Sequence, residues 1–130
     1  MSYFQYDKSF GYKFIPKIKK RILHESGGYI IETNNDGFRD TKNFSFQKTN
    51  NKKRILIFGD SFTAGTGVSN FQRYTDLVEN LRSDIEIFNF SIPGTGTDQQ
   101  YLIFKEYYKK IEFDHVILAF MTENIRRVKS

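Results

Sequence analysis

Cysteine and tryptophan are absent from this sequence of 130 residues, and proline and histidine each occur only twice. Because there is no thiol, disulfides and thiolate metal sites are excluded. Metal ligation has little other support, and we predict neither a metal nor a cofactor. No stretch approaches the roughly 20 apolar residues of a membrane-spanning helix, and the N-terminus lacks the basic start and apolar run of a secretory signal. The sequence therefore predicts a cytoplasmic chain with no membrane span.

The composition favours one compact domain. Hydrophobic residues make up 38% of the sequence and aromatic residues 17%, which is enough material for a core. The formal net charge is +5, but the basic residues are scattered in short clusters at 17–21, 52–54 and 126–127. Such clusters are typical of a solvated surface, so we predict no nucleic-acid partner.

The first 52 residues differ in pattern from the rest. They are aromatic and rich in Asn and Lys, with turn signals at 27–28 (Gly-Gly) and 34–37 (Asn-Asn-Asp-Gly). A short strand is predicted at 29–33, and residues 38–40 are expected to pack against the main domain. We therefore predict an irregular N-terminal extension over 1–52 and an α/β domain over 53–130.

From residue 53 onward, strand and helix patterns alternate, which predicts βαβ units and a parallel sheet. The predicted strands lie at 54–58, 85–89 and 115–120. Residues 116–120 are apolar on both faces, as in strands covered by helices on each side. Such a strand should not be a sheet edge, because an open apolar edge pairs with other chains. We therefore expect the front part of a larger domain, incomplete at the C-terminus, with self-association through the third strand.

Two helices are predicted between these strands. The first presents apolar residues at i, i+3, i+4 and i+7, which indicates one side facing the core: Tyr74, Leu77, Val78 and Leu81. Asp98 is the predicted N-cap of the second helix. The apolar side of this second helix is predicted to hold Tyr101, Phe104, Tyr108 and Ile111.

Polar or glycine residues follow each predicted strand at the same edge of the sheet. Ser61 comes directly after the first strand, Gly94 follows the second and Asn124 follows the third. Ligands of open α/β sheets bind at this carboxyl edge, which makes Ser61 a candidate nucleophile. Each residue also has a simpler interpretation, since Ser61 and Asn124 are common helix caps and Gly94 after a proline is a common turn residue.

Three short motifs carry a resemblance to a known family. They are residues 59–62 (Gly-Asp-Ser-Phe), 89–94 (Asn-Phe-Ser-Ile-Pro-Gly) and 122–124 (Thr-Glu-Asn). In this order they resemble the serine, glycine and asparagine blocks of the SGNH, or GDSL-type, hydrolases, over roughly residues 53–125. Residues 37–40 (Gly-Phe-Arg-Asp) also resemble the lead-in of some bacterial members.

The resemblance implies a flavodoxin-like three-layer αβα fold and a serine esterase acting on an acyl or acetyl ester of a small molecule or a carbohydrate. Ser61 would attack the ester carbonyl. The oxyanion would be held by the backbone N–H groups of Ser61 and Gly94 and by the side-chain amide of Asn124, an arrangement that lowers the barrier of acyl transfer. Asp60 is expected to support the loop by hydrogen bonding and not to act as a triad acid.

The sequence departs from the family in two places. Glu123 precedes Asn124 and Ile125 follows it, where the family has glycine before the asparagine and aspartate after it. The family's catalytic histidine lies in an Asp-x-x-His block far downstream, and this sequence contains no such block. Its two histidines are His24, in the extension, and His115, predicted at the opposite end of the sheet from Ser61.

A serine hydroxyl without a neighbouring base is a poor nucleophile, so weak or no turnover is expected of this chain. The alternative function is therefore a non-catalytic relative that binds a glycan or an ester. Phosphate binding by the glycine-rich loops fits less well, because residues 59–67 lack the Gly-Lys-Ser/Thr ending of a P-loop.

Overall fold

The computed structural model describes residues 3–25 and 27–122. A three-stranded sheet forms its centre: β5 (Lys53–Gly59) lies between β6 (Ile85–Asn89) and β7 (His115–Ala119), and both neighbours pair with β5 in parallel. The three strands predicted for the α/β part are confirmed. Their carboxyl ends meet at one edge of the sheet, because all three strands run in the same direction.

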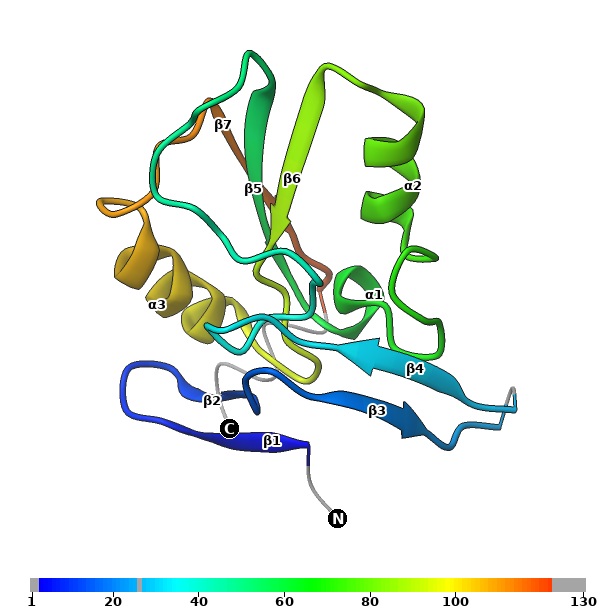
Figure 1. The fold of residues 1–130 in the computed structure, drawn as a ribbon. Coiled ribbons are helices and arrows are strands. Elements are labelled where there is room, and N and C mark those ends of the chain that lie inside the picture. Colours follow the sequence, from blue (N-terminus) through cyan, green and yellow to red (C-terminus); the bar gives the residue numbers. More distant parts are fainter. Residues whose placement is uncertain (1–2, 26, 123–130) are drawn as a thin grey trace.

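Three helices follow the strands: α1 (Ser61–Ala64), α2 (Tyr74–Leu81) and α3 (Thr97–Tyr107). Figure 1 shows α2 on one side of the sheet and α3 on the other. The described part of the chain is thus a mixed α/β structure with a parallel sheet. None of its helices is long and apolar enough to cross a membrane.

The N-terminal segment holds two antiparallel hairpins, so the prediction that it is irregular is wrong. Strand β1 (Phe4–Asp7) pairs with β2 (Gly11–Phe14), and β3 (Lys19–Ile22) pairs with β4 (Tyr29–Glu32). The strand predicted at 29–33 corresponds to β4. All four strands have only four residues, and β1, β2 and β3 lack the run of aromatic and β-branched residues that indicates β4. Both hairpins lie across the end of the sheet toward which β5 and β6 run (Figure 1).

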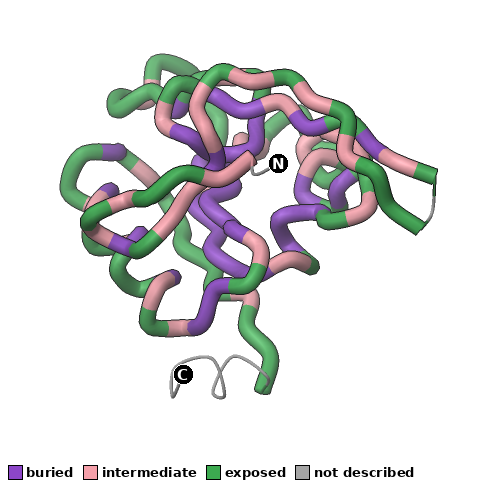
Figure 2. Tube along the Cα trace, turned by 90° about the horizontal axis from the view of Figure 1, so that it is seen from below, coloured by how far each residue is buried: buried purple, intermediate pink, exposed green. Residues whose placement is uncertain are grey.

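The N-terminal segment and the sheet share one hydrophobic core. Phe38, Phe44 and Phe10 come from the N-terminal segment, and their side chains are at most 3% exposed. They belong to the same cluster as apolar residues of the sheet, of α3 and of the segments that follow β6 and α3: Leu56, Phe58, Phe88, Phe90, Ile92, Ile103, Tyr107 and Ile111. The buried stretches of chain gather in the middle of the molecule (Figure 2). The expectation that residues 38–40 pack against the main domain is confirmed for Phe38.

The apolar stripe of α2 does not face the core, contrary to the prediction. Its four residues are between 39% and 81% exposed: Tyr74, Leu77, Val78 and Leu81. The buried residue of the helix is Thr75. Helical spacing places side chains on one face, but the position of the helix against β6 decides which face is covered.

Helix α3 also differs from its predicted pattern. The N-cap is Gly96, and Asp98 lies inside the first turn. The buried residues are Gln100, Ile103 and Tyr107, whereas Tyr101 is exposed. The buried face is therefore offset from the predicted one. Gln100 is tolerated there because its amide donates to Thr95, which follows the glycine block.

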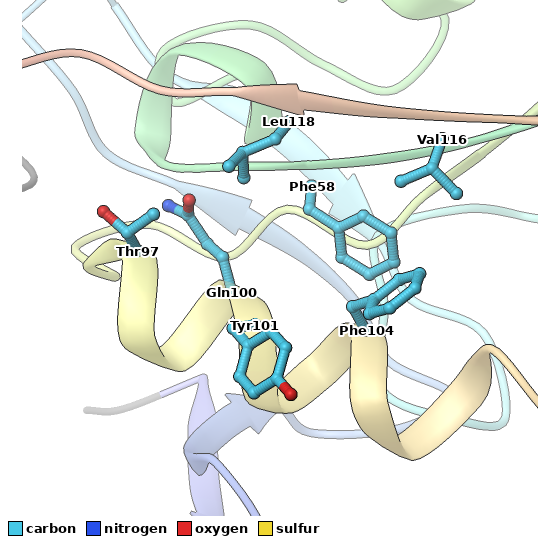
Figure 3. A pocket seen from close by; sticks show the side chains of 7 residues that line it. All are labelled: Phe58, Thr97, Gln100, Tyr101, Phe104, Val116 and Leu118. Atoms are coloured by element: carbon cyan, nitrogen blue, oxygen red, sulfur yellow. The ribbon is translucent and has the colours of Figure 1, made fainter.

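Strand β7 is one of the two edge strands of the sheet within the described residues, with β6 at the other edge. Val116, Ile117 and Leu118 are 41% to 44% exposed, although they are apolar on both faces. An apolar hollow of about 300 Å³ lies between β7 and α3, lined by Val116, Leu118, Phe58 and Phe104 among others (Figure 3). Self-association through this strand stays a prediction.

The carboxylate of Asp114 connects the starts of β5 and β7. It accepts hydrogen bonds from Nζ of Lys48 at 2.6 Å and from the backbone N–H of Arg54 at 2.8 Å. The Lys48 side chain first, and the Arg54 N–H second, lower the pKa of Asp114 to about 2. The pKa of an aspartate in an unfolded chain is about 4, so between about pH 4 and pH 2 the Asp114 carboxyl is protonated to a greater extent in the unfolded chain than in the folded chain. The stabilisation is therefore complete above about pH 4 and is lost as the pH falls through about 2.

Replacing Asp114 with asparagine should test this contribution. We expect Asp114→Asn to lower the urea midpoint of unfolding at pH 6 and to have progressively less effect between pH 4 and pH 2. The measurement is urea unfolding of the two proteins over that range. A difference in midpoint that does not depend on pH would contradict the prediction.

Candidate functional site

Ser61 stands at the carboxyl edge of the sheet, separated from the end of β5 by Asp60 alone. The turn into α1 requires glycine at position 59, because a Cβ there would lie 2.8 Å from Cβ of Thr63 and 3.0 Å from the carbonyl oxygen of Ala119. This close approach of strand and helix brings Ser61 to the first position of α1. The Ser61 side chain is half-buried.

Asp60, and not Ser61, is the N-cap of α1. Its carboxylate accepts a hydrogen bond from the backbone N–H of Phe62 at 3.1 Å. The simpler interpretation of Ser61 as a helix cap is therefore wrong, and the expected supporting role of Asp60 in the loop is confirmed. With Asp60 as the cap, the Ser61 hydroxyl is not used in the start of the helix.

The glycine block runs beside the end of β5. The backbone N–H of Phe90 donates to the carbonyl of Ile57 at 2.8 Å, and that of Ile92 donates to the carbonyl of Gly59 at 3.3 Å. The Thr95 hydroxyl donates to the carbonyls of Ile92 and Gly59. These bonds hold the loop that contains Gly94 against the residues that precede Ser61.

Asn89, the first residue of the glycine block, ties this loop to α1. Its buried amide nitrogen donates to the carbonyl of Thr63 at 2.9 Å and to the hydroxyl of Thr75 at 3.0 Å. Its amide oxygen accepts from the N–H of Ser91 at 2.9 Å. Sequence reasoning gave Asn89 no separate role. The sequence feature that could have indicated such a role is the position of Asn89 at the end of an apolar strand, where a buried amide must form hydrogen bonds.

Arg39 is a second supporting residue that sequence reasoning missed. Its guanidinium donates to the carbonyls of Ala64 and Gly65 at 2.8 and 2.7 Å, to that of Val68, and to Oδ1 of Asn70 at 2.8 Å. Burial, and to a lesser degree the charge of a nearby arginine, lower the Arg39 pKa to about 10, so the group stays charged at neutral pH. Arg39 thereby fixes the loop that follows α1.

A hollow of about 400 Å³ opens beside Ser61. Phe62, Arg73 and Tyr74 line it together with the loop after α1. Phe62 is largely exposed, and the Arg73 guanidinium is paired with the Asp76 carboxylate through contacts of 2.8 and 2.9 Å. This hollow offers aromatic surface next to the serine, while the charge of Arg73 is neutralised by Asp76.

The backbone N–H groups of Ser61 and Gly94 form no hydrogen bond with any of residues 3–25 and 27–122. Gly94 has φ of +79°, a conformation that favours glycine. The structure thus places Ser61 and Gly94 after neighbouring strands at one edge of the sheet, each with an N–H that has no partner among the described residues. Asn124, the third predicted site residue, lies outside the described residues.

No protein-family model matches this chain, and no curated protein sequence does. The relation to the SGNH hydrolases is therefore a resemblance carried by short motifs. The spatial arrangement of those motifs is the remaining evidence on function.

The two histidines occupy different parts of the molecule. His115 begins β7 and pairs with Ile55, at the end of the sheet opposite Ser61, as expected from the sequence. His24 follows β3 and lies beside Gly67, where its Cε1 is 3.4 Å from the position a Cβ would take. The His24 ring also contacts the edge of Tyr29 at a centroid distance of 5.9 Å.

Among the described residues, no group of three or more His, Asp and Glu side chains is arranged to hold a metal ion. The residues at the candidate site offer a hydroxyl, backbone N–H groups and aromatic side chains. These are groups suited to an ester carbonyl and the oxyanion that forms from it.

Proposed function

We propose that this chain is an SGNH-type, or GDSL-type, ester hydrolase with Ser61 as the nucleophile. The observation that carries the proposal is the pair of N–H groups of Ser61 and Gly94 at the carboxyl edge of the sheet, with no described partner. The strand order β6-β5-β7 supports a flavodoxin-like fold, because the first three strands of that fold have the spatial order 2-1-3. Asn124 would supply a third donor from the end of the third strand.

In this proposal, Oγ of Ser61 bonds to the carbonyl carbon of the ester, and its proton passes to an imidazole base, which His24 or a histidine of a partner chain would have to supply. The carbonyl oxygen becomes an oxyanion that accepts hydrogen bonds from the N–H groups of Ser61 and Gly94. The alcohol then leaves with a proton, and water hydrolyses the acyl-enzyme. The substrate class is an acyl or acetyl ester of a small molecule or a carbohydrate. Phe62 and Tyr74 offer aromatic surface for either one.

A second candidate function is a non-catalytic module that binds an ester or a glycan in the same hollow. The position of His115 favours it, because His115 begins β7 at the end of the sheet opposite Ser61. A serine whose proton no base accepts would bind a carbonyl without attacking it efficiently.

Hydrolysis of a small aryl acetate separates the two functions. We expect the wild-type chain to hydrolyse it faster than buffer and Ser61→Ala to fall to the buffer rate, since the mutant has no nucleophile. Ser83→Ala is the matched control, because Ser83 is an exposed residue before β6, at the other end of the sheet. Mass spectrometry after treatment with a fluorophosphonate should find one adduct, on Ser61.

Equal rates for the wild type and Ser61→Ala would overturn the hydrolase. Saturable binding of a non-hydrolysable acetamide analogue by both proteins would then support the binding module.

A further inference from the structure

The first hairpin makes a direct hydrogen bond to the glycine block. The hydroxyl of Tyr12, in the middle of β2, donates to the carbonyl oxygen of Pro93 at 2.5 Å. A Cβ on Gly94 would lie 2.9 Å from the same hydroxyl oxygen. The Tyr12 hydroxyl therefore binds Pro93 and lies close to Gly94, the two residues of the peptide unit that contributes the Gly94 N–H to the candidate site.

Because the peptide unit is planar, a hydrogen bond to its carbonyl oxygen also fixes the direction of its N–H. The described residues contain no cis peptide bond, so the Pro93 carbonyl and the Gly94 N–H point in opposite directions in one plane. A hydroxyl that holds the carbonyl thus also sets the direction of the N–H. It further polarises the unit, because hydrogen bonds to a carbonyl strengthen the donor at its amide.

We propose that Tyr12 is a positioning residue for the oxyanion site, which holds the Pro93–Gly94 peptide so that its N–H points at the reacting carbonyl. This inference rests on the proposed function, since it assigns a task to a donor that the proposal names. It also gives the N-terminal segment a part in the chemistry, although that segment carries none of the three motifs.

A second contact anchors the hairpin to the same loop. Nε2 of Gln99 donates to the carbonyl of Phe10 at 3.2 Å, while its Oε1 accepts from the N–H of Gly96 at 3.3 Å. Phe10 is itself buried in the shared core. The turn between β1 and β2 therefore cannot move away from the glycine loop without breaking core contacts, which keeps Tyr12 in place.

The test uses Tyr12→Phe, which removes the hydroxyl and keeps the ring. Tyr6→Phe is the matched control, because Tyr6 pairs with Tyr12 across the hairpin but is 78% exposed. The probe is phenylboronic acid. Its boron bonds to Oγ of Ser61 and the serine proton passes to solvent, which leaves a tetrahedral boronate that resembles the oxyanion. Acetanilide, a trigonal amide, reports ground-state binding.

Loss of one oxyanion donor typically costs about 10²–10³-fold, and Tyr12 acts through such a donor. We therefore expect Tyr12→Phe to weaken boronate binding about 10-fold, measured by boron NMR, with acetanilide affinity unchanged. Tyr6→Phe should bind both phenylboronic acid and acetanilide as tightly as the wild type does. Thermal unfolding of both variants checks that the hairpin is intact.

The outcomes separate the two proposals. If the wild type and Ser61→Ala bind phenylboronic acid equally, the proposed function fails and the inference falls with it. If binding depends on Ser61 but Tyr12→Phe binds as tightly as the wild type, only the inference about Tyr12 is overturned. Equal weakening of boronate and acetanilide binding would also overturn it, because a merely structural role predicts that result.

Discussion

Replacing Arg39 with methionine is expected to lower the free energy of unfolding by about 3–5 kcal/mol, a large part of the stability of a domain of this size. The guanidinium is buried and donates to three carbonyls of the loop after α1, those of Ala64, Gly65 and Val68, and to Oδ1 of Asn70. Methionine has a similar length but no donor. The loop would keep its desolvated acceptors without partners, and each costs about 1–3 kcal/mol.

Urea unfolding measures this loss directly. Arg82→Met is the matched control, because the Arg82 side chain is exposed and pairs with the equally exposed Asp84 at 2.7 Å. That change should alter stability by at most about 0.5 kcal/mol. Arg39→Lys should fall between the wild type and Arg39→Met, since lysine keeps the charge but not the planar fork of donors. A loss in Arg39→Met no larger than that in Arg82→Met would contradict the assigned role.

Replacing Gly94 with alanine is expected to reduce the binding of phenylboronic acid by about 100-fold, the cost of losing one oxyanion donor. It should also cost about 2 kcal/mol of stability, because φ of +79° is strained for a residue with a Cβ. The new Cβ would lie 2.9 Å from the Tyr12 hydroxyl oxygen. Either the Tyr12 hydroxyl or the Pro93–Gly94 peptide must move. Each movement would change the direction in which the Gly94 N–H points.

Gly27→Ala is the control for backbone strain alone. Gly27 also has a positive φ, of +111°, but nothing lies within 4 Å of the position of its Cβ. We expect a modest loss of stability and unchanged boronate binding. The double variant Tyr12→Phe with Gly94→Ala should lose less stability than the sum of the single losses, because removing the hydroxyl relieves the contact. Additive losses would indicate that Tyr12 and Gly94 do not interact.

The lead-in motif at 37–40 now has a physical explanation. Gly37 has φ of +82°, and a Cβ there would lie 2.5 Å from the carbonyl oxygen of Phe14, so the position requires glycine. Phe38 fills the shared core, and Arg39 holds the loop after α1. Asp40 accepts from the backbone N–H of Lys42, and burial raises its pKa. Within this motif, the contacts of Gly37, Phe38 and Arg39 explain its residues by the packing of the N-terminal segment and by the loop after α1.

The sequence by itself determined the parallel sheet and the sheet edge at which Ser61 and Gly94 lie. Continuous apolar runs at 54–58, 85–89 and 115–120 are local signals, and β5, β6 and β7 formed where these runs predicted them. Parallel pairing then places everything that follows the strands, including Ser61 and Gly94, at one edge. That consequence needs only the common direction of the strands.

Only the tertiary structure decided which surfaces the elements bury and which distant residues support the site. The spacing of Leu77 and Leu81 indicated an amphipathic helix, but the position of α2 against β6 leaves both residues exposed. Arg39 and Tyr12 reach partners that lie at least 25 residues away along the chain. No local pattern encodes such contacts, because they depend on how the two hairpins pack across the end of the sheet.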